Sequence, residues 1–131
     1  MRLLAAGDFA HVYDCRQSAA SGPLVLYAAP NRAVEGVRIG LSVSRRVGNA
    51  VVRNRWKRRL REACRAIRRD LPPGNDVVIV VRSGDVPRGT TGARAIEETI
   101  VALVGRVAGR RGYATAVPVP RAAAAKPRRR R

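Results

Sequence analysis

Basic side chains are concentrated in residues 45–65, a stretch that reads RRVGNAVVRNRWKRRLREACR and contains one acidic residue, Glu62. Guanidinium and ammonium groups bind phosphate oxygens through charge-assisted hydrogen bonds, so such a run predicts a binding site for a polyanion. A merely solvated surface is the weaker interpretation, because solvated helix faces usually mix acidic and basic residues.

The acidic residues, by contrast, show no pattern that a protein nuclease would need. The adjacent pair Glu97 and Glu98 occupies diverging positions of a predicted helix, and His11 is the only histidine. Hydrolysis requires a positioned general base or a carboxylate cluster that holds metal ions. Cys15 and Cys64 have no partner at metal-ligand spacing. We therefore predict no catalytic residue and no metal site in the protein itself.

The overall charge indicates nucleic acid as the partner. The chain has 131 residues, with 27 Lys and Arg against 9 Asp and Glu, and a formal net charge of +18. Such a balance favours nucleic acid first and an anionic membrane surface second. The apolar run at residues 1–6 is too short for a secretion signal, and no stretch approaches the roughly 20 apolar residues of a membrane span. We expect a cytoplasmic protein that does not bind membranes.

The basic stretch is predicted to form an amphipathic helix that begins at Ala50 and is capped by Asn49. Like charges one turn apart, such as Lys57 and Arg61, repel by a few tenths of a kcal/mol, so a bound polyanion would relieve strain on the helix. Apolar residues at helical spacing would form its buried stripe: Val52, Trp56, Leu60, Ala63, Cys64, Ile67 and Leu71.

The other segments predict an α+β fold, a two-layer α/β sandwich in one domain over residues 1–111. Residues 112–131 are rich in Pro, Ala and Arg and are expected to form a disordered basic tail that adds only non-specific affinity. The predicted elements are a helix at 8–13, a possible strand at 15–19, strands at 23–29 and 37–43 that pair as a hairpin, a strand at 76–82 buried on both faces, and a helix at 91–108 whose buried stripe is Ile96, Ile100, Leu103, Val104 and Val107.

Residues 42–61, SVSRRVGNAVVRNRWKRRLR, resemble the signature of the bacterial ribonuclease P protein family. That signature is an Arg-Asn-Arg-x-Lys-Arg-x-x-Arg helix after a Ser-Val-Ser strand end, and the resemblance in element order extends from about residue 8 to residue 107. Two features depart from the family: Trp56 stands where an aliphatic residue is usual, and the segment before Asp8 is shorter and less basic. Six residues match the signature position by position: Arg53, Asn54, Arg55, Lys57, Arg58 and Arg61.

The resemblance implies that the basic helix makes a left-handed crossover between parallel strands, where general rules favour a right-handed one. It implies a protein subunit that promotes 5′ maturation of tRNA, while a catalytic RNA performs the cleavage with magnesium ions held by RNA. The implied partners are that RNA and precursor tRNA, with no small-molecule substrate. The residues expected to bind RNA are Arg45, Arg46, Asn49, Arg53, Asn54, Arg55, Lys57, Arg58, Arg61 and Arg65.

The resemblance also implies a cleft that holds the single-stranded 5′ leader of the substrate. Phe9, Tyr13 and Tyr27 match its aromatic positions and are expected to line a groove open to solvent on one side. Isolated aromatic residues are more often part of a core, and this interpretation stays open for all three.

Other kinds of protein share parts of this pattern. A ribosomal or RNA-chaperone-type protein would have the same charge without any processing activity. A DNA-binding helix would usually present two or three base-reading side chains rather than basic residues all round. A membrane-surface helix would expose the apolar stripe that the core requires here.

Overall fold

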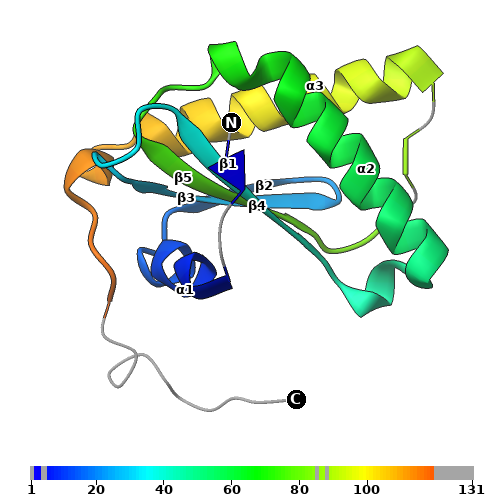
Figure 1. Ribbon diagram of the computed structural model, residues 1–131, viewed down its shortest axis with the longest axis horizontal. Helices are drawn as coiled ribbons and strands as arrows, with labels where there is room; N and C mark the ends of the chain where they lie inside the picture. The colour runs from blue at the N-terminus through cyan, green and yellow to red at the C-terminus, as the bar shows by residue number, and fades with distance from the viewer. Residues whose placement is uncertain (1, 4–5, 85, 88, 120–131) are drawn as a thin grey trace.

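The computed structural model describes residues 2–3, 6–84, 86–87 and 89–119, which form one mixed sheet with helices on both faces (Figure 1). Helices α2 and α3 cover one face, and α1 lies on the other (Figure 1). The strands are β1 (Arg2–Leu3), β2 (Ser18–Ser21), β3 (Leu24–Pro30), β4 (Val37–Val43) and β5 (Asn75–Val81). The α-helices are α1 (Ala6–Asp14), α2 (Ala50–Ile67) and α3 (Gly89–Ala108), and the short 3-10 helices are η1 (Arg45–Val47), η2 (Arg68–Asp70) and η3 (Tyr113–Thr115).

The order of strands in the sheet is β1-β4-β5-β3-β2. The predicted hairpin of residues 23–29 with residues 37–43 is wrong, because β5 lies between β3 and β4. In the register, Ile79 of β5 pairs with Leu26 on one side and Leu41 on the other. The loop of residues 31–36 spans the roughly 10 Å across the intervening strand. The central position suits β5, which is apolar on both faces and needs a hydrogen-bonding neighbour at each edge.

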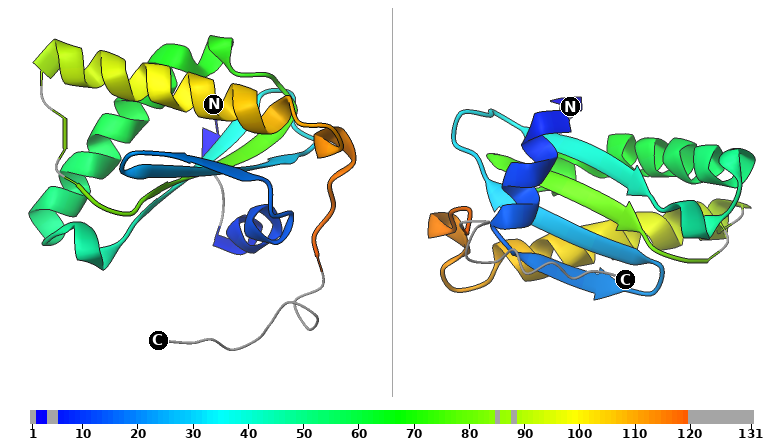
Figure 2. Two further views of the ribbon diagram at one scale, coloured as in Figure 1. Left: turned by 180° about the vertical axis from the view of Figure 1, so that it is seen from behind. Right: turned by 90° about the horizontal axis from the view of Figure 1, so that it is seen from below.

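The connection from β4 through α2 to β5 is a left-handed crossover. In the right-hand view of Figure 2, β4 and β5 both point to the right, β5 lies below β4, and α2 lies behind the sheet. A right-handed crossover would have placed α2 on the face that α1 covers. The expectation drawn from the resemblance is therefore confirmed against the general rule.

Two apolar cores lie on the two faces of the sheet. The larger one packs α2 and α3 against alternate strand residues such as Leu26, Ile39 and Ile79. The predicted stripes of both helices lie in or against this core. The smaller core, under α1, contains Val12, Cys15, Ala29 and Val78. Cys64 lies in the larger core and Cys15 in the smaller one, so the sheet separates them and both thiols are free.

Two side-chain hydrogen bonds fix the N-terminal half of α2. Asn49 caps it as predicted, since its side-chain oxygen accepts a 3.0 Å hydrogen bond from the backbone N–H of Val52. Trp56 is fully buried, and its indole Nε1 donates to the carbonyl of Gly84 at 3.1 Å. The large side chain at this position therefore also anchors the loop that follows β5.

Within the described residues, no helix is sufficiently long and apolar to cross a membrane.

Residues 112–119 correct the predicted start of the tail. Tyr113 is buried in the larger core, and its hydroxyl donates to Oδ1 of Asn75 at 2.6 Å. The backbone N–H of Val119 donates to the carbonyl of Asp14 at 2.8 Å. This segment thus packs on the domain, because Tyr113 buries apolar area and its hydroxyl donates to the buried side-chain amide of Asn75. Residues 120–131 of the predicted tail lie outside the described part of the chain.

We expect Tyr113→Phe to lower the free energy of unfolding by about 1–3 kcal/mol. The change leaves Oδ1 of Asn75 without its buried donor, while the Asn75 side-chain amide still donates to the carbonyls of Pro72 and Pro73. Urea unfolding followed by Trp56 fluorescence measures the loss. Thr115→Val, which removes an exposed hydroxyl from the same short helix, is the control and should stay within about 0.5 kcal/mol; an equal effect of both changes would contradict the assignment.

Candidate RNA interface

The exposed side of α2 carries the densest positive charge in the described structure. Its members, which we call the basic face, are all exposed and share helical spacing: Asn54, Arg55, Arg58, Arg61 and Arg65. Arg45 and Arg46 are also exposed, in the short helix η1 that precedes α2. The buried stripe of α2 points into the larger core, so these side chains cannot turn away from solvent.

The remaining predicted RNA-binding residues are less free than the basic face, because two of them make hydrogen bonds within the protein and the third is half-buried. Nη1 of Arg53 donates to the carbonyl of Gly48 at 2.8 Å, which closes the turn before α2. Asn49 is engaged in capping the helix, and Lys57 is half-buried. Arg53 and Asn49 therefore stabilise the start of α2, and all three residues offer less free surface to RNA than the basic face does.

A groove that the sequence did not predict lies beside the basic face, between α2 and the loop after β5. It has a volume of about 990 Å³, and its arginine wall comes from Arg55, Arg58 and Arg59 of α2. Val86 and Pro87, from the loop after β5, form an apolar wall. Arg59, which we did not predict, also forms a 3.8 Å ion pair with Glu62. Its spacing of four residues from Arg55 was the available signal.

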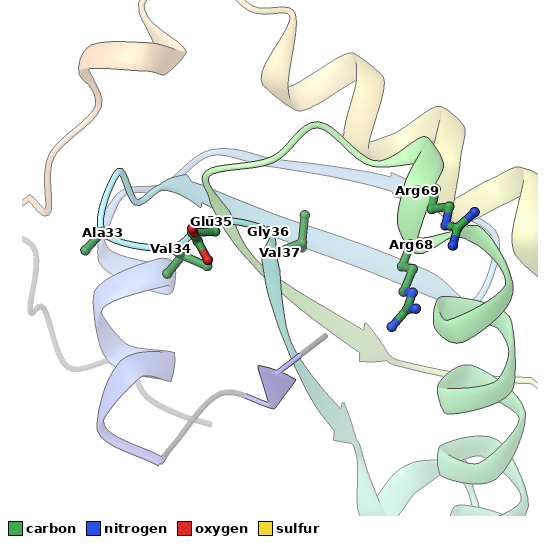
Figure 3. Close-up of a pocket in the computed structure, with 7 residues that line it drawn as sticks. All are labelled: Ala33, Val34, Glu35, Gly36, Val37, Arg68 and Arg69. Carbon is green, nitrogen blue, oxygen red and sulfur yellow. The ribbon is translucent and has the colours of Figure 1, made fainter.

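A second depression, of about 570 Å³, lies near the other end of α2 (Figure 3). Arg68 and Arg69 lie on one side of it, and the loop that leads into β4 lies on the other. Glu35 belongs to that loop, so its carboxylate offsets part of the positive charge. The groove beside Arg55 is also lined by one acidic residue, Glu62, but it has three arginines against two in the depression, so the groove is the more positive of the two.

The three predicted leader-binding residues lie together between α1 and the sheet. The rings of Phe9 and Tyr13 have centroids 6.3 Å apart, and those of Tyr13 and Tyr27 are 4.9 Å apart, both in edge-on geometry. We call these three residues the aromatic row. All three are half-buried, so they combine a core contact with a solvent-facing part. Burial raises the pKa of the Tyr13 hydroxyl, although a polar contact with Ser42 partly opposes the rise.

Beside the aromatic row, much of this sheet face has no helix over it. In the right-hand view of Figure 2, α1 crosses the strands near one end only. On the same face, Val25, Ser42 and Val80 are half-buried rather than buried. The arrangement exposes an apolar and aromatic surface on which flat rings could stack.

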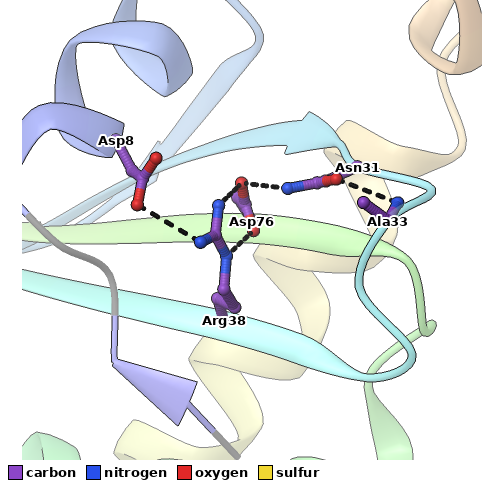
Figure 4. A network of polar contacts seen from close by, with 5 residues as sticks. All are labelled: Asp8, Asn31, Ala33, Arg38 and Asp76. Atoms are coloured by element: carbon purple, nitrogen blue, oxygen red, sulfur yellow. Dashed lines mark hydrogen bonds and ion pairs between the residues drawn. The ribbon is translucent and has the colours of Figure 1, made fainter.

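A network around Arg38, which we did not predict, joins α1 to this face (Figure 4). Nε and Nη2 of Arg38 donate to the two carboxylate oxygens of Asp76 at 2.8 Å each, and Nη1 donates to Oδ2 of Asp8 at 3.2 Å. Asn31 donates to Oδ2 of Asp76 at 3.0 Å. Burial raises the pKa of the Asp76 carboxyl, but the hydrogen bonds from Arg38 and Asn31 outweigh it and hold the pKa below its usual value.

The fold and this surface define a class: an α/β sandwich with a polycationic helix on one side of the sheet and half-buried aromatic rings on the other. The sequence pattern of the Ribonuclease P family matches residues 1–106. This chain therefore belongs to the ribonuclease P protein family.

Individual relatives agree with this membership. A ribonuclease P protein component of Gluconacetobacter diazotrophicus is 41% identical over 112 residues, which cover 85% of this chain and 93% of the relative. One from Brevibacillus brevis is 45% identical over 83 residues, which cover 63% of this chain and just under two thirds, 66%, of that relative.

Solved structures share the fold. The ribonuclease P protein of Staphylococcus aureus superposes with a TM-score of 0.63 at 25% identity, over 80% of this chain and 93% of that one. The Thermotoga maritima protein shows the same fold, with a TM-score of 0.62 over 82% of this chain and 97% of that one. A further S. aureus structure, with a TM-score of 0.61 at 26% identity over 82% of this chain and 87% of that one, is described as a mutant with defective mRNA degradation activity.

Proposed function

We propose that this protein is the non-catalytic subunit of ribonuclease P and promotes the endonucleolytic 5′ maturation of precursor tRNA in the cytoplasm. The observation that carries the proposal is the pair of surfaces that the sheet separates. A polycationic helix suits a folded RNA with dense phosphates, and a half-buried aromatic row that keeps a solvent-facing part suits unpaired bases.

The two surfaces have different tasks in this proposal. The basic face, with Arg45 and Arg46, binds the phosphates of the catalytic RNA, which requires charge but little sequence information. The aromatic row binds the 5′ leader of the substrate. Stacking on aromatic rings tolerates any base, which suits leaders that differ from one precursor to the next.

The chemistry in this proposal belongs to the RNA, with magnesium ions held by RNA. Two carboxylates of the protein that do approach each other, Asp8 and Asp76, are both paired with the guanidinium group of Arg38. An arginine between two carboxylates offsets part of their charge and competes with a metal ion for the same oxygens.

Reconstitution tests the function directly. Added to its cognate catalytic RNA at low magnesium, the protein is expected to promote cleavage of precursor tRNA at the 5′ end of the mature sequence. The protein freed of RNA is expected to cleave neither precursor tRNA nor an mRNA at any magnesium concentration, because the sequence predicts no catalytic residue that would activate water. Cleavage by the RNA-free protein would contradict the non-catalytic role, and no stimulation of the RNA would favour the alternative of a structural RNA-binding protein of the ribosomal or chaperone type.

The leader site has its own prediction. We expect Tyr13→Ala and Tyr27→Ala each to weaken the binding of precursor tRNA with a long leader by about 1–3 kcal/mol, the value of one stacked base. Binding of precursor with a very short leader should be unchanged. Affinities measured for the reconstituted complex, after circular dichroism has shown that each variant is folded, separate these results. Equal losses on both substrates would return the two tyrosines to a purely structural role.

A further inference from the structure

We propose that β4 positions the aromatic row through three residues on its α1-facing side, with Arg38 and Gly40 as positioning residues for binding of the single-stranded leader. This inference rests on the proposed leader site. It assigns positioning roles to Arg38 and Gly40, which do not contact RNA in that proposal. It follows from the register of β4 against α1: residues 38, 40 and 42 of the strand contact residues 8, 9 and 13 of the helix in the same order.

The middle contact is the most restrictive. A Cβ atom at residue 40 would lie 2.5 Å from Cζ of Phe9 and 2.9 Å from Cε1 of the same ring. Real Cβ atoms essentially never come so close to another heavy atom, so any side chain at this position would push the ring away. Gly40 is also buried, within a strand, where a glycine often marks the close approach of another group. The glycine therefore determines how closely Phe9, and with it the first turn of α1, approaches the sheet.

The contact on one side is ionic. Arg38 is paired with Asp76 in the register of β4 and β5, and two parallel hydrogen bonds hold its guanidinium group against that carboxylate. This fixed guanidinium reaches Asp8 in the first turn of α1 at 3.2 Å. A planar group held at two points has little freedom left, so the first turn of α1 is tied to a rigid part of the sheet.

The contact on the other side leads to the remaining rings. The side chain of Ser42 lies near enough to the hydroxyl of Tyr13 to lower its pKa, and the Tyr13 ring packs edge-on against Tyr27 of β3. Three successive α1-facing positions of β4 thus act on α1 and on the rings of Phe9 and Tyr13, and Tyr13 passes the effect to Tyr27 through their edge-on contact. Because a binding surface has to be held within about 0.5 Å of its productive geometry, displacing Phe9 should weaken stacking at the whole row.

Gly40→Ala in the reconstituted complex tests this inference. We expect it to weaken the binding of long-leader precursor tRNA about tenfold, the loss of roughly one stacked base, and to leave short-leader binding and catalytic-RNA binding unchanged. Gly36→Ala is the matched control, because a methyl group there meets no atom within 4 Å. Asp8→Asn, which loosens the ionic contact without changing the sheet, should have an effect of the same kind that is smaller than tenfold.

A double variant distinguishes a displaced ring from general damage to the strand. In a Phe9→Ala background the added methyl group has room, so Gly40→Ala should cause no further loss of long-leader affinity. Additive losses would overturn the inference. Gly40→Ala alone could fail to fold. In that case the steric account requires the double variant, Phe9→Ala with Gly40→Ala, to fold. A double variant that does not fold would overturn the inference.

The test separates this inference from the proposed function. If Phe9→Ala, Tyr13→Ala and Tyr27→Ala are all insensitive to leader length, the leader site itself is wrong. If they are sensitive but Gly40→Ala behaves like Gly36→Ala, the leader site stands and the positioning role of β4 is wrong.

Discussion

The affinity of this protein for the catalytic RNA of the proposed complex is expected to fall about 100-fold between roughly 50 and 200 mM salt. Each phosphate that a cationic group neutralises releases counterions and contributes about −0.7 to −0.9 to the slope of log affinity against log salt. The basic face provides Arg55, Arg58, Arg61 and Arg65, all exposed, with Arg45 and Arg46 beside them. Four or five such contacts give a slope of about −3 to −4.

Binding isotherms across a salt series, measured with the catalytic RNA alone, give this slope. Arg55→Ala should make the slope shallower by about one contact and weaken binding at low salt. The control is Arg106→Ala, which removes an exposed arginine of α3 outside the predicted site and should leave the slope unchanged. An affinity that is flat across the series would refute the electrostatic assignment of α2.

The second large effect concerns stability. We expect Arg38→Met to lower the free energy of unfolding at neutral pH by about 3–5 kcal/mol. The side chain of Asp76 is only 1% exposed, and without Arg38 its negative charge would be buried with Asn31 as the one side-chain donor left among the described residues. The double variant Arg38→Met with Asp76→Asn removes both charges and should recover much of the loss. Arg82→Met, at an exposed arginine that bonds the Gly22 carbonyl, is the control and should cost less than about 1 kcal/mol.

The same network gives a pH dependence with a definite sign. Arg38 and Asn31 hold the pKa of Asp76 below its value in the unfolded chain, about 3.9. The resulting stabilisation is fully present above that value and is lost as the pH falls through the lower pKa of the folded state. In Arg38→Met the positive charge that lowers the pKa of Asp76 is gone, while burial still raises it. The pKa of Asp76 therefore rises, and the carboxyl is protonated more readily. Urea unfolding at several pH values should therefore show the gap between wild type and variant narrowing in acid; a constant gap would contradict this account.

Residue order alone was sufficient for the elements whose signals are local. The start of α2 at Ala50, its cap at Asn49 and its buried stripe all follow from helical period and from a side chain that bonds a backbone N–H three residues away. The bounds of β4 and the two-sided burial of β5 follow from alternation and from an unbroken β-branched run. Such features depend on neighbours within a few residues, so the chain order already contains them.

Strand order and the contacts across the sheet were decided by tertiary structure. The hairpin expected between β3 and β4 gave way to β5, a strand more than thirty residues further along than β4, because a doubly apolar strand is best placed in the centre of the sheet. Tyr113 joined the core for a similar reason, since Asn75 needed a buried donor. The Arg38 network and the approach of Phe9 to Gly40 also depend on which strands are adjacent. None of these contacts has a periodic signal in the chain, because each one joins residues that only the assembled sheet brings within bonding distance.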